Sequence, residues 1–244
     1  MPSLHSNQWG AISPAVMGEL RDDDTYVVTC DNGHVTTAYL QANRFEVLFD
    51  LGMYAILDGY YREAVANFAS ALEGFYGWFI DVVCTSCAFD YDKRQKIWKN
   101  VANQSERQFG AFYYLWTIQF KEEPRILLEN DVRFRNIVIH KGALPSRNDA
   151  IDFGQRILEI IYPQLSMVKE TYSDAVQATA IQRMARATAK YSTNVATIAI
   201  WTSISTVNSM STTIPPDVRK LLDVVKISKR LFSEFPSASK NSQT

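Results

Sequence analysis

The chain has 244 residues, of which 47% are hydrophobic and 21% are charged, and its formal net charge is −1 at pH 7. This composition permits a buried core and excludes wholesale disorder. Proteins that coat long nucleic acids without sequence preference are normally basic, so any contact with nucleic acid must be local. The length allows one domain with extensions, or two small domains.

The first 24 residues contain no basic segment followed by an apolar run, the pattern that marks a secretory signal peptide. The longest apolar stretches are short and interrupted by threonine and serine, so none is expected to span a bilayer. Three cysteines, an odd number, cannot form a complete disulfide framework. We therefore expect a cytoplasmic protein that makes no membrane contact.

The first part of the chain, residues 1–42, is expected to contain a lead-in and one β-hairpin. The lead-in shows no periodicity and is expected to be loosely ordered as far as the acidic run 22–24. Two β-branched runs, 26–30 and 35–40, then flank an Asn-Gly pair, which is a strong signal for a hairpin turn. No other segment gives a clear strand signal.

From residue 43 the apolar residues recur with the period of an α-helix. The pattern predicts helices over residues 45–56, 64–83, 97–116, 126–140 and 150–165. The second has an apolar stripe wide enough to pack against more than one neighbour. Ser146 and Asp149 fit a capping box that opens the fifth. Residues 43–172 are therefore predicted to form a compact antiparallel helical bundle.

The remaining residues, 173–244, are expected to form a helical extension with a disordered tail. Residues 173–190 are rich in alanine and look helical, whereas 191–213 are dense in threonine and serine and remain ambiguous. A Pro-Pro-Asp sequence then begins a last helix, and the tail from residue 237 is expected to be disordered. The predicted fold class is thus mostly α: a helical bundle with an amino-terminal hairpin and a carboxy-terminal extension.

Segment 133–142 has the highest density of side chains that can bind a phosphate or transfer a proton. Within ten residues it contains Arg133, Arg135, Asn136, His140 and Lys141. The guanidinium of arginine offers a permanent charge and a fixed fork of donors to a phosphate, and histidine can move a proton near neutral pH. Together they form a minimum set for metal-free cleavage of a phosphodiester by a neighbouring hydroxyl.

Helix geometry limits how these residues can cooperate. Asn136 and His140 are four apart and share a helix face, whereas Arg135 and His140 are five apart and rotated by about 140°. Either the helix ends before His140, or a second protomer completes the site. A purely structural alternative pairs the arginine with Asp131 or Glu129 and leaves the histidine to cap the helix carboxyl end.

Arg135-Asn136 followed by His140 resembles the signature of the HEPN superfamily, which is an arginine, a polar residue, a few residues and a histidine near the end of a helical bundle. The context is similar over residues 43–172, including 60–65 leading to 71–73. The resemblance therefore implies that the predicted bundle is HEPN-like.

The resemblance implies a metal-independent endoribonuclease that needs no cofactor and works as a homodimer with a composite active site. His140 is then the acid/base, Arg135 holds the scissile phosphate, and Asn136 orients the motif or the phosphate. Arg133 and Lys141 are the expected RNA-binding residues. The expected products carry a 2′,3′-cyclic phosphate and a 5′-hydroxyl.

Proteins of this kind are commonly toxins or effectors of anti-phage defence, so an antitoxin or a defence-system protein is a possible partner. Some HEPN toxins carry a modifiable tyrosine two residues after the histidine, where this chain has Gly142. Two alternatives stay open: a non-catalytic HEPN module for dimerisation or RNA binding, and a ligand-sensing regulator.

Three further features have competing interpretations. Cys30, His34, Cys84 and Cys87 provide four possible zinc ligands, although Cys84 also fits the apolar stripe of a helix as a small hydrophobic residue. The basic cluster of residues 93–99 is either a solvated helix face or an RNA guide. Glu73 is expected either to contact the active cleft or to pair with an arginine.

Overall fold

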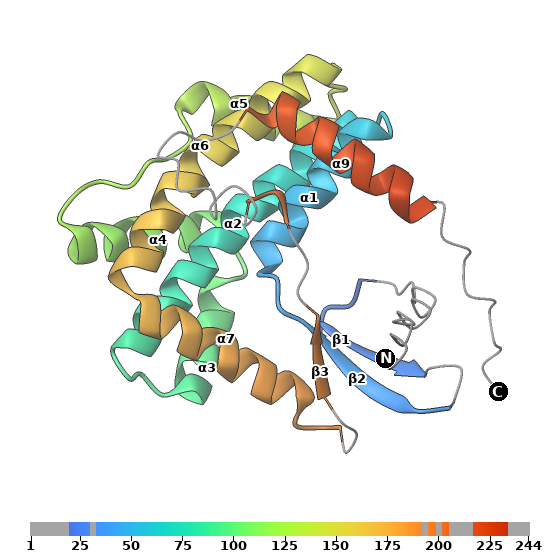
Figure 1. Cartoon of the computed structure of the whole chain (residues 1–244). Coiled ribbons are helices and arrows are strands. Elements are labelled where there is room, and N and C mark those ends of the chain that lie inside the picture. Colours follow the sequence, from blue (N-terminus) through green and yellow to red (C-terminus); the bar gives the residue numbers. More distant parts are fainter. Residues whose placement is uncertain (1–19, 30–32, 192–194, 199–201, 205–216, 234–244) are drawn as a thin grey trace, which may run out of the picture.

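The computed structural model describes residues 20–29, 33–191, 195–198, 202–204 and 217–233. Within them the chain is mostly helical, with a small sheet beside the helices (Figure 1). The strands are β1 (Thr25–Thr29), β2 (Val35–Leu40) and β3 (Val195–Ile198). The helices are α1 (Arg44–Leu57), α2 (Tyr61–Ser86), α3 (Tyr91–Val101), α4 (Ser105–Phe120), α5 (Glu129–Lys141), α6 (Arg147–Thr171), α7 (Ser173–Thr188) and α9 (Val218–Ser233).

The long helix α2 is the centre of the molecule and contacts α1, α4, α5, α6 and α7. Its wide apolar stripe is buried, as the periodicity predicted. Aromatic rings fill the space between α2 and α4: the rings of Phe79 and Phe112 lie 5.5 Å apart, and those of Phe79 and Trp116 lie 5.1 Å apart. Burial of these large side chains is the main stabilising contribution to the fold.

Two glycines allow α1 and α6 to approach α2 closely. A Cβ atom added to Gly52 of α1 would lie 2.5 Å from the ring of Phe68, and one added to Gly154 of α6 would lie 2.7 Å from the same ring. Phe68 of α2 is fully buried between them. The absence of side chains at both positions therefore lets one phenylalanine fill the junction of the three helices.

The predicted helix over 97–116 is wrong in one respect, because the structure divides this region into α3 and α4. Gln104, between them, has an extended backbone with φ −142° and ψ 131°, so the helix is interrupted. By contrast, the predicted capping box is confirmed: the hydroxyl of Ser146 accepts a hydrogen bond from the amide of Asp149, and the carboxylate of Asp149 accepts one from the amide of Ser146.

The predicted hairpin is confirmed, since β1 and β2 pair antiparallel with Thr25 opposite Tyr39. The sheet also contains β3, which pairs parallel to β2 with Thr37 opposite Val195. The sequence did not reveal β3, because four residues in a region dense in threonine and serine give too short a pattern.

The segments on either side of the bundle pack against it. Helix α7 contacts α2 and β2, and α9 contacts α1 and α6 through a buried face that includes Leu221 and Leu222. At the end of the lead-in, Asp23 and Asp24 form ion pairs with Lys190 and Arg183, whereas residues 1–19 lie outside the described residues. The expected tail, 237–244, lies outside the described residues. Across the described segments, no helix combines the length and apolarity needed to cross a membrane.

Candidate active site

Helix α5 carries the predicted site residues, and charged side chains in its first and last turns stabilise its two ends. Glu129 and Asp131 lie in its first turn, and His140 and Lys141 in its last, so the charges complement the helix dipole. Gly142 ends the helix with φ +72°, the left-handed conformation that glycine adopts without a steric penalty. The expectation that the helix could end before His140 is therefore wrong.

One side of α5 is fixed to α6. The rings of Phe134 and Phe153 lie 5.6 Å apart, and Val138 is fully buried nearby. The carboxylate of Asp131 lies 2.8 Å from Nε of Arg156 on α6. These contacts set the rotation of α5 about its own axis, and so decide where its other side chains point.

An adjacent side of α5 is fixed to α2 by two arginines, Arg135 of α5 and Arg62 of α2. Nη2 of Arg135 donates a hydrogen bond to Oε1 of Glu73 at 2.6 Å, and the same guanidinium donates through Nη1 to Oδ1 of Asn136 at 3.0 Å. Nη2 of Arg62 donates to the carbonyl oxygen of Ile139 at 3.3 Å, and so satisfies one of the carbonyls left unpaired at a helix end.

The partner of Arg135 differs from both partners that the structural alternative proposed. Asp131 instead pairs with Arg156, and Arg135 pairs with Glu73, which confirms one of the two expectations for that glutamate. Burial raises the pKa of Glu73, and the positive charge of Arg135 acts in the opposite direction. Arg62 and Glu73 lie in the segments 60–65 and 71–73 that carry the resemblance, but the sequence did not identify their partners, which lie 77 and 62 residues away.

The other predicted site residues lie toward solvent. Arg133, His140 and Lys141 are exposed, and Asn136 is half-buried. Spacings of three and four residues place Arg133, Asn136 and His140 along one stripe of α5, whereas Arg135 lies on another side. Within one chain, the structure therefore brings Arg135 to Asn136 and Glu73 but does not bring it to His140.

The zinc interpretation is not supported by the described residues, among which no group of three or more His, Cys, Asp or Glu side chains is arranged to hold a metal ion. Cys30 lies outside the residues that the structure describes. Cys84 is half-buried and Cys87 is exposed at the end of α2, both with free thiols.

The basic cluster of residues 93–99 is not uniformly solvated. Arg94 is only 5% exposed, and its guanidinium donates to the carbonyl oxygen of Asp81 at 3.2 Å and to Oε1 of Gln182 at 2.7 Å. It therefore joins α3 to α2 and α7, while Lys93, Lys96 and Lys99 remain exposed.

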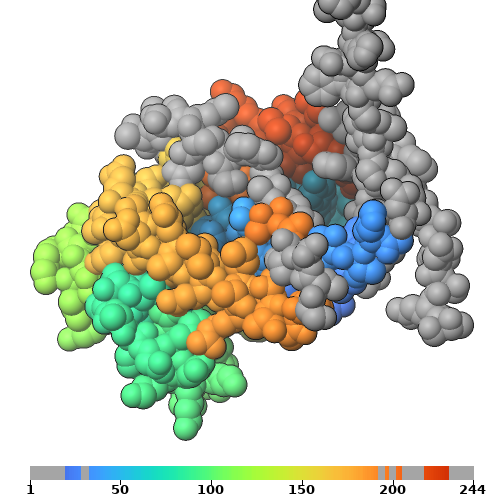
Figure 2. Space-filling view, turned by 60° about the horizontal axis from the view of Figure 1, so that its bottom comes forward, coloured from blue at the N-terminus to red at the C-terminus, as the bar shows by residue number. Residues whose placement is uncertain are grey.

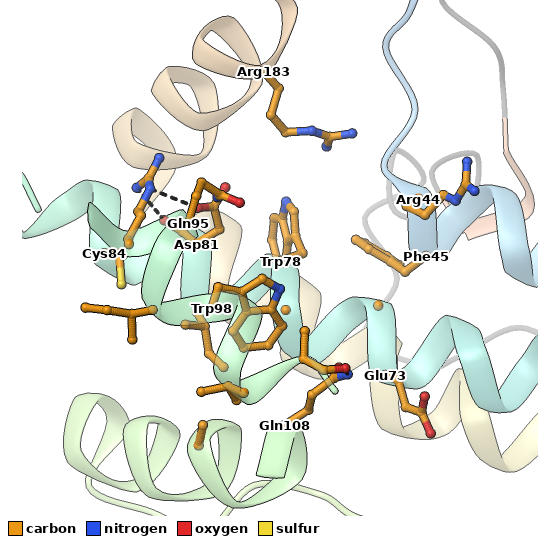
Figure 3. A pocket seen from close by; sticks show the side chains of 18 of the residues that line it. Arg44, Phe45, Glu73, Trp78, Asp81, Cys84, Gln95, Trp98, Gln108 and Arg183 are labelled. Carbon is orange, nitrogen blue, oxygen red and sulfur yellow. Dashed lines mark hydrogen bonds and ion pairs between the residues drawn. The ribbon is translucent and has the colours of Figure 1, made fainter. Parts of the chain in front are cut away.

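A cavity of about 560 Å³ lies between α2, α3, α4, α7 and the start of α1 (Figure 3). Its wall includes Glu73, the partner of Arg135, and the indoles of Trp78 and Trp98. Figure 2 shows α7, whose Arg183 lines this cavity, at the molecular surface between the α2–α3 region and the amino-terminal strands. The volume is in the range of small-molecule sites.

No protein-family model, curated protein or solved structure matches the chain.

Proposed function

We propose that the protein is a metal-independent endoribonuclease of the HEPN type, in which α5 carries the catalytic residues. His140 takes the proton of the attacking 2′-hydroxyl or gives one to the leaving 5′ oxygen, and solvent completes the other transfer. Arg135 stabilises the charge that gathers on the phosphate in the transition state. The bond from phosphorus to the 5′ oxygen breaks, leaving a 2′,3′-cyclic phosphate and a 5′-hydroxyl.

The observation that carries this proposal is the way α5 holds the motif. Arg135 is fixed by Glu73 and Asn136, which orient its guanidinium before any substrate binds. His140 is exposed in the last helical turn, where RNA can reach its imidazole. Phosphodiester cleavage requires preorganised donors and an accessible proton-transfer group, and α5 supplies one of each on different sides of the helix.

The proposed enzyme is a homodimer, because Arg135 and His140 point apart in one chain. Pairing of two α5 helices brings the arginine of one protomer to the histidine of the other. Exposed apolar side chains surround α5 and support such a contact; they include Leu128, Val132 and Leu144. Arg133 and Lys141, also exposed, then bind the RNA backbone on either side of the scissile phosphate.

The same ion pair favours a second candidate function. Arg135 has a partner within its own chain, so the motif also suits a non-catalytic module that dimerises or binds RNA through α5. In that case the histidine does no chemistry, and His140→Ala leaves RNA affinity and biological function unchanged.

Cleavage of mixed cellular RNA in the presence of EDTA tests the proposal. We expect the wild type to produce fragments with cyclic-phosphate ends, and Arg135→Ala and His140→Ala to lose cleavage while keeping their fold by circular dichroism. His34→Ala, a change of an exposed histidine in the hairpin, is the matched control and should cleave normally. Equal cleavage by all variants would place the chemistry elsewhere and overturn the assignment.

A further inference from the structure

The cavity between α2, α3 and α7 combines aromatic walls with three cationic side chains, those of Arg44, Arg94 and Arg183. The indoles of Trp78 and Trp98 line it (Figure 3); Trp78 is 8% exposed and its ring stacks on Phe75, whereas Trp98 is half-buried. A Cβ atom on Gly77 would lie 3.0 Å from Cζ2 of Trp98, so a glycine on α2 lets this indole rest directly on the helix. Ile97 lines the same cavity and is 54% exposed, which leaves apolar surface uncovered.

The charges around the cavity are not balanced by its own walls. Asp81 is paired with Arg94, since its Oδ1 lies 3.1 Å from Nε of that arginine. Glu73 is paired with Arg135 at 2.6 Å. The two remaining charged lining residues, Arg44 and Arg183, are both cations.

These two arginines form ion pairs with the acidic run that precedes β1. Nη2 of Arg44 pairs with the carboxylate of Asp22, and Nη2 of Arg183 lies 3.3 Å from the carboxylate of Asp24. The side chain of Asp22 is 96% exposed, so this carboxylate approaches the arginine from solvent and is held by little else. Asp24 also lies 4.0 Å from Nη1 of Arg44, so its carboxylate contacts both arginines.

Asp24 is held more firmly than Asp22. Its carbonyl oxygen accepts a hydrogen bond from the amide of Leu40 at 2.9 Å, and its side chain is only 16% exposed. Nη1 of Arg183 also donates to Oδ1 of Asn43 at 3.0 Å. Asp24 and Asn43 therefore orient the guanidinium of Arg183, whereas Asp22 can leave Arg44 at little cost.

We propose that this cavity binds a small aromatic anion of the size of a nucleoside monophosphate. The ring lies against the indoles of Trp78 and Trp98, and the phosphate or carboxylate binds Arg44 and Arg183. Planar arginine forks suit such groups, and stacking on an aromatic side chain suits a nucleobase. Asp22 competes with the ligand for Arg44. The site is separate from the exposed stripe of α5, and ligand binding does not depend on RNA cleavage.

Calorimetric titration of the full chain tests the proposal. The probes are aromatic anions: the nucleotides AMP, GMP, CMP and UMP, and the carboxylate indole-3-acetate. Adenosine, which lacks the anionic group, and inorganic phosphate, which lacks the ring, are the control ligands. At least one aromatic anion should bind with one site per chain, and more tightly than either half. Arg44→Gln should weaken its binding by about tenfold and Trp98→Leu by about fivefold or more.

The variant Asp22→Asn distinguishes two roles of this cluster of charges: a ligand site in which Asp22 competes for Arg44, and a set of contacts that only stabilises the fold. Removal of a competing carboxylate should tighten binding by about threefold, whereas loss of a structural contact would weaken it or leave it unchanged. Arg219→Gln removes an arginine from an exposed ion pair on α9 and is the matched control. The proposal is overturned by the absence of binding of every aromatic anion, by equal binding of inorganic phosphate, or by unchanged affinity in both cavity variants.

Discussion

Nη2 of Arg135 lies 2.6 Å from Oε1 of Glu73, and this pair joins the helix that carries the proposed catalytic motif to the central helix of the bundle. The two side chains are 20% and 29% exposed, so water screens the pair only in part. The arginine thereby has a fixed direction, set by a glutamate that lies 62 residues earlier in the chain.

The first prediction concerns the energy of this pair. Glu73→Gln leaves the guanidinium half-buried without its counter-charge and should lower the free energy of unfolding by about 1–2 kcal/mol. A double-mutant cycle with Arg135→Gln, followed by urea denaturation, should give a coupling energy of about 1 kcal/mol. Strictly additive effects would contradict the interaction. If the proposed enzyme needs the oriented arginine, Glu73→Gln should also slow RNA cleavage while His34→Ala does not.

Helix periodicity predicted the bundle and local signals predicted the hairpin and the capping box, because each depends on residues close in sequence. The division between α3 and α4 was missed, although six polar residues, 103–108, interrupt the apolar pattern between Ala102 and Phe109. For the candidate site, the sequence named the residues of α5 and Glu73, but it did not establish that Glu73 pairs with Arg135. Glu73 is 62 residues from Arg135, and Arg183 is 159 residues from Asp24, so only the tertiary structure brings these charges together.

A second prediction tests the close approach at Phe68. Gly52→Ala places a methyl group 2.5 Å from its ring and should lower the free energy of unfolding by about 2–3 kcal/mol through overpacking. Gly110→Ala is the control, because no atom lies within 4 Å of the added Cβ and alanine favours the helix. In urea denaturation, Gly110→Ala should be neutral or stabilising. Combining Gly52→Ala with Phe68→Leu should recover part of the loss if the ring is the obstacle.

A third prediction is a pH dependence at Asp50 of α1. Both oxygens of this carboxylate accept hydrogen bonds from the amide of Ser203, yet burial raises its pKa to about 6. The folded state therefore binds a proton more tightly than the unfolded state, and the stabilising contribution is full below pH 4 and lost as pH rises through 6. Above pH 7, Asp50→Asn should therefore be more stable than the wild type by up to about 3 kcal/mol. Screening of the carboxylate by water makes this difference smaller.

Chemical denaturation of both proteins at several pH values measures this difference. Asp149→Asn provides a control of opposite sign, because hydrogen bonds from Ser146 lower the pKa of Asp149. Its deficit relative to the wild type should grow as pH rises through the acid range. A constant difference between Asp50→Asn and the wild type from pH 4 to 8 would contradict the raised pKa.

A fourth prediction follows from the burial of Arg94. Nε of this arginine lies 3.1 Å from Asp81 but lacks the angle of a hydrogen bond, while its Nη atoms donate to α2 and α7. Arg94→Ala leaves the partly buried Asp81 without its cation and should lower the free energy of unfolding by about 3 kcal/mol. Lys96→Ala, a change of an exposed residue on the same helix, should have little effect in the same thermal or urea denaturation.

The last prediction distinguishes a composite active site from one within a single chain. Arg135 and His140 lie on different sides of α5, so neither chain of the proposed dimer has both residues in one site. Arg135→Ala and His140→Ala proteins, each inactive alone, should recover cleavage when they are mixed and allowed to exchange subunits. At equal amounts, half of the dimers have one intact site of two, and activity should reach about a quarter of the wild type. Native mass spectrometry shows whether the subunits have exchanged. If they exchange and no activity returns, both residues of a working site belong to the same protomer, which contradicts the composite arrangement.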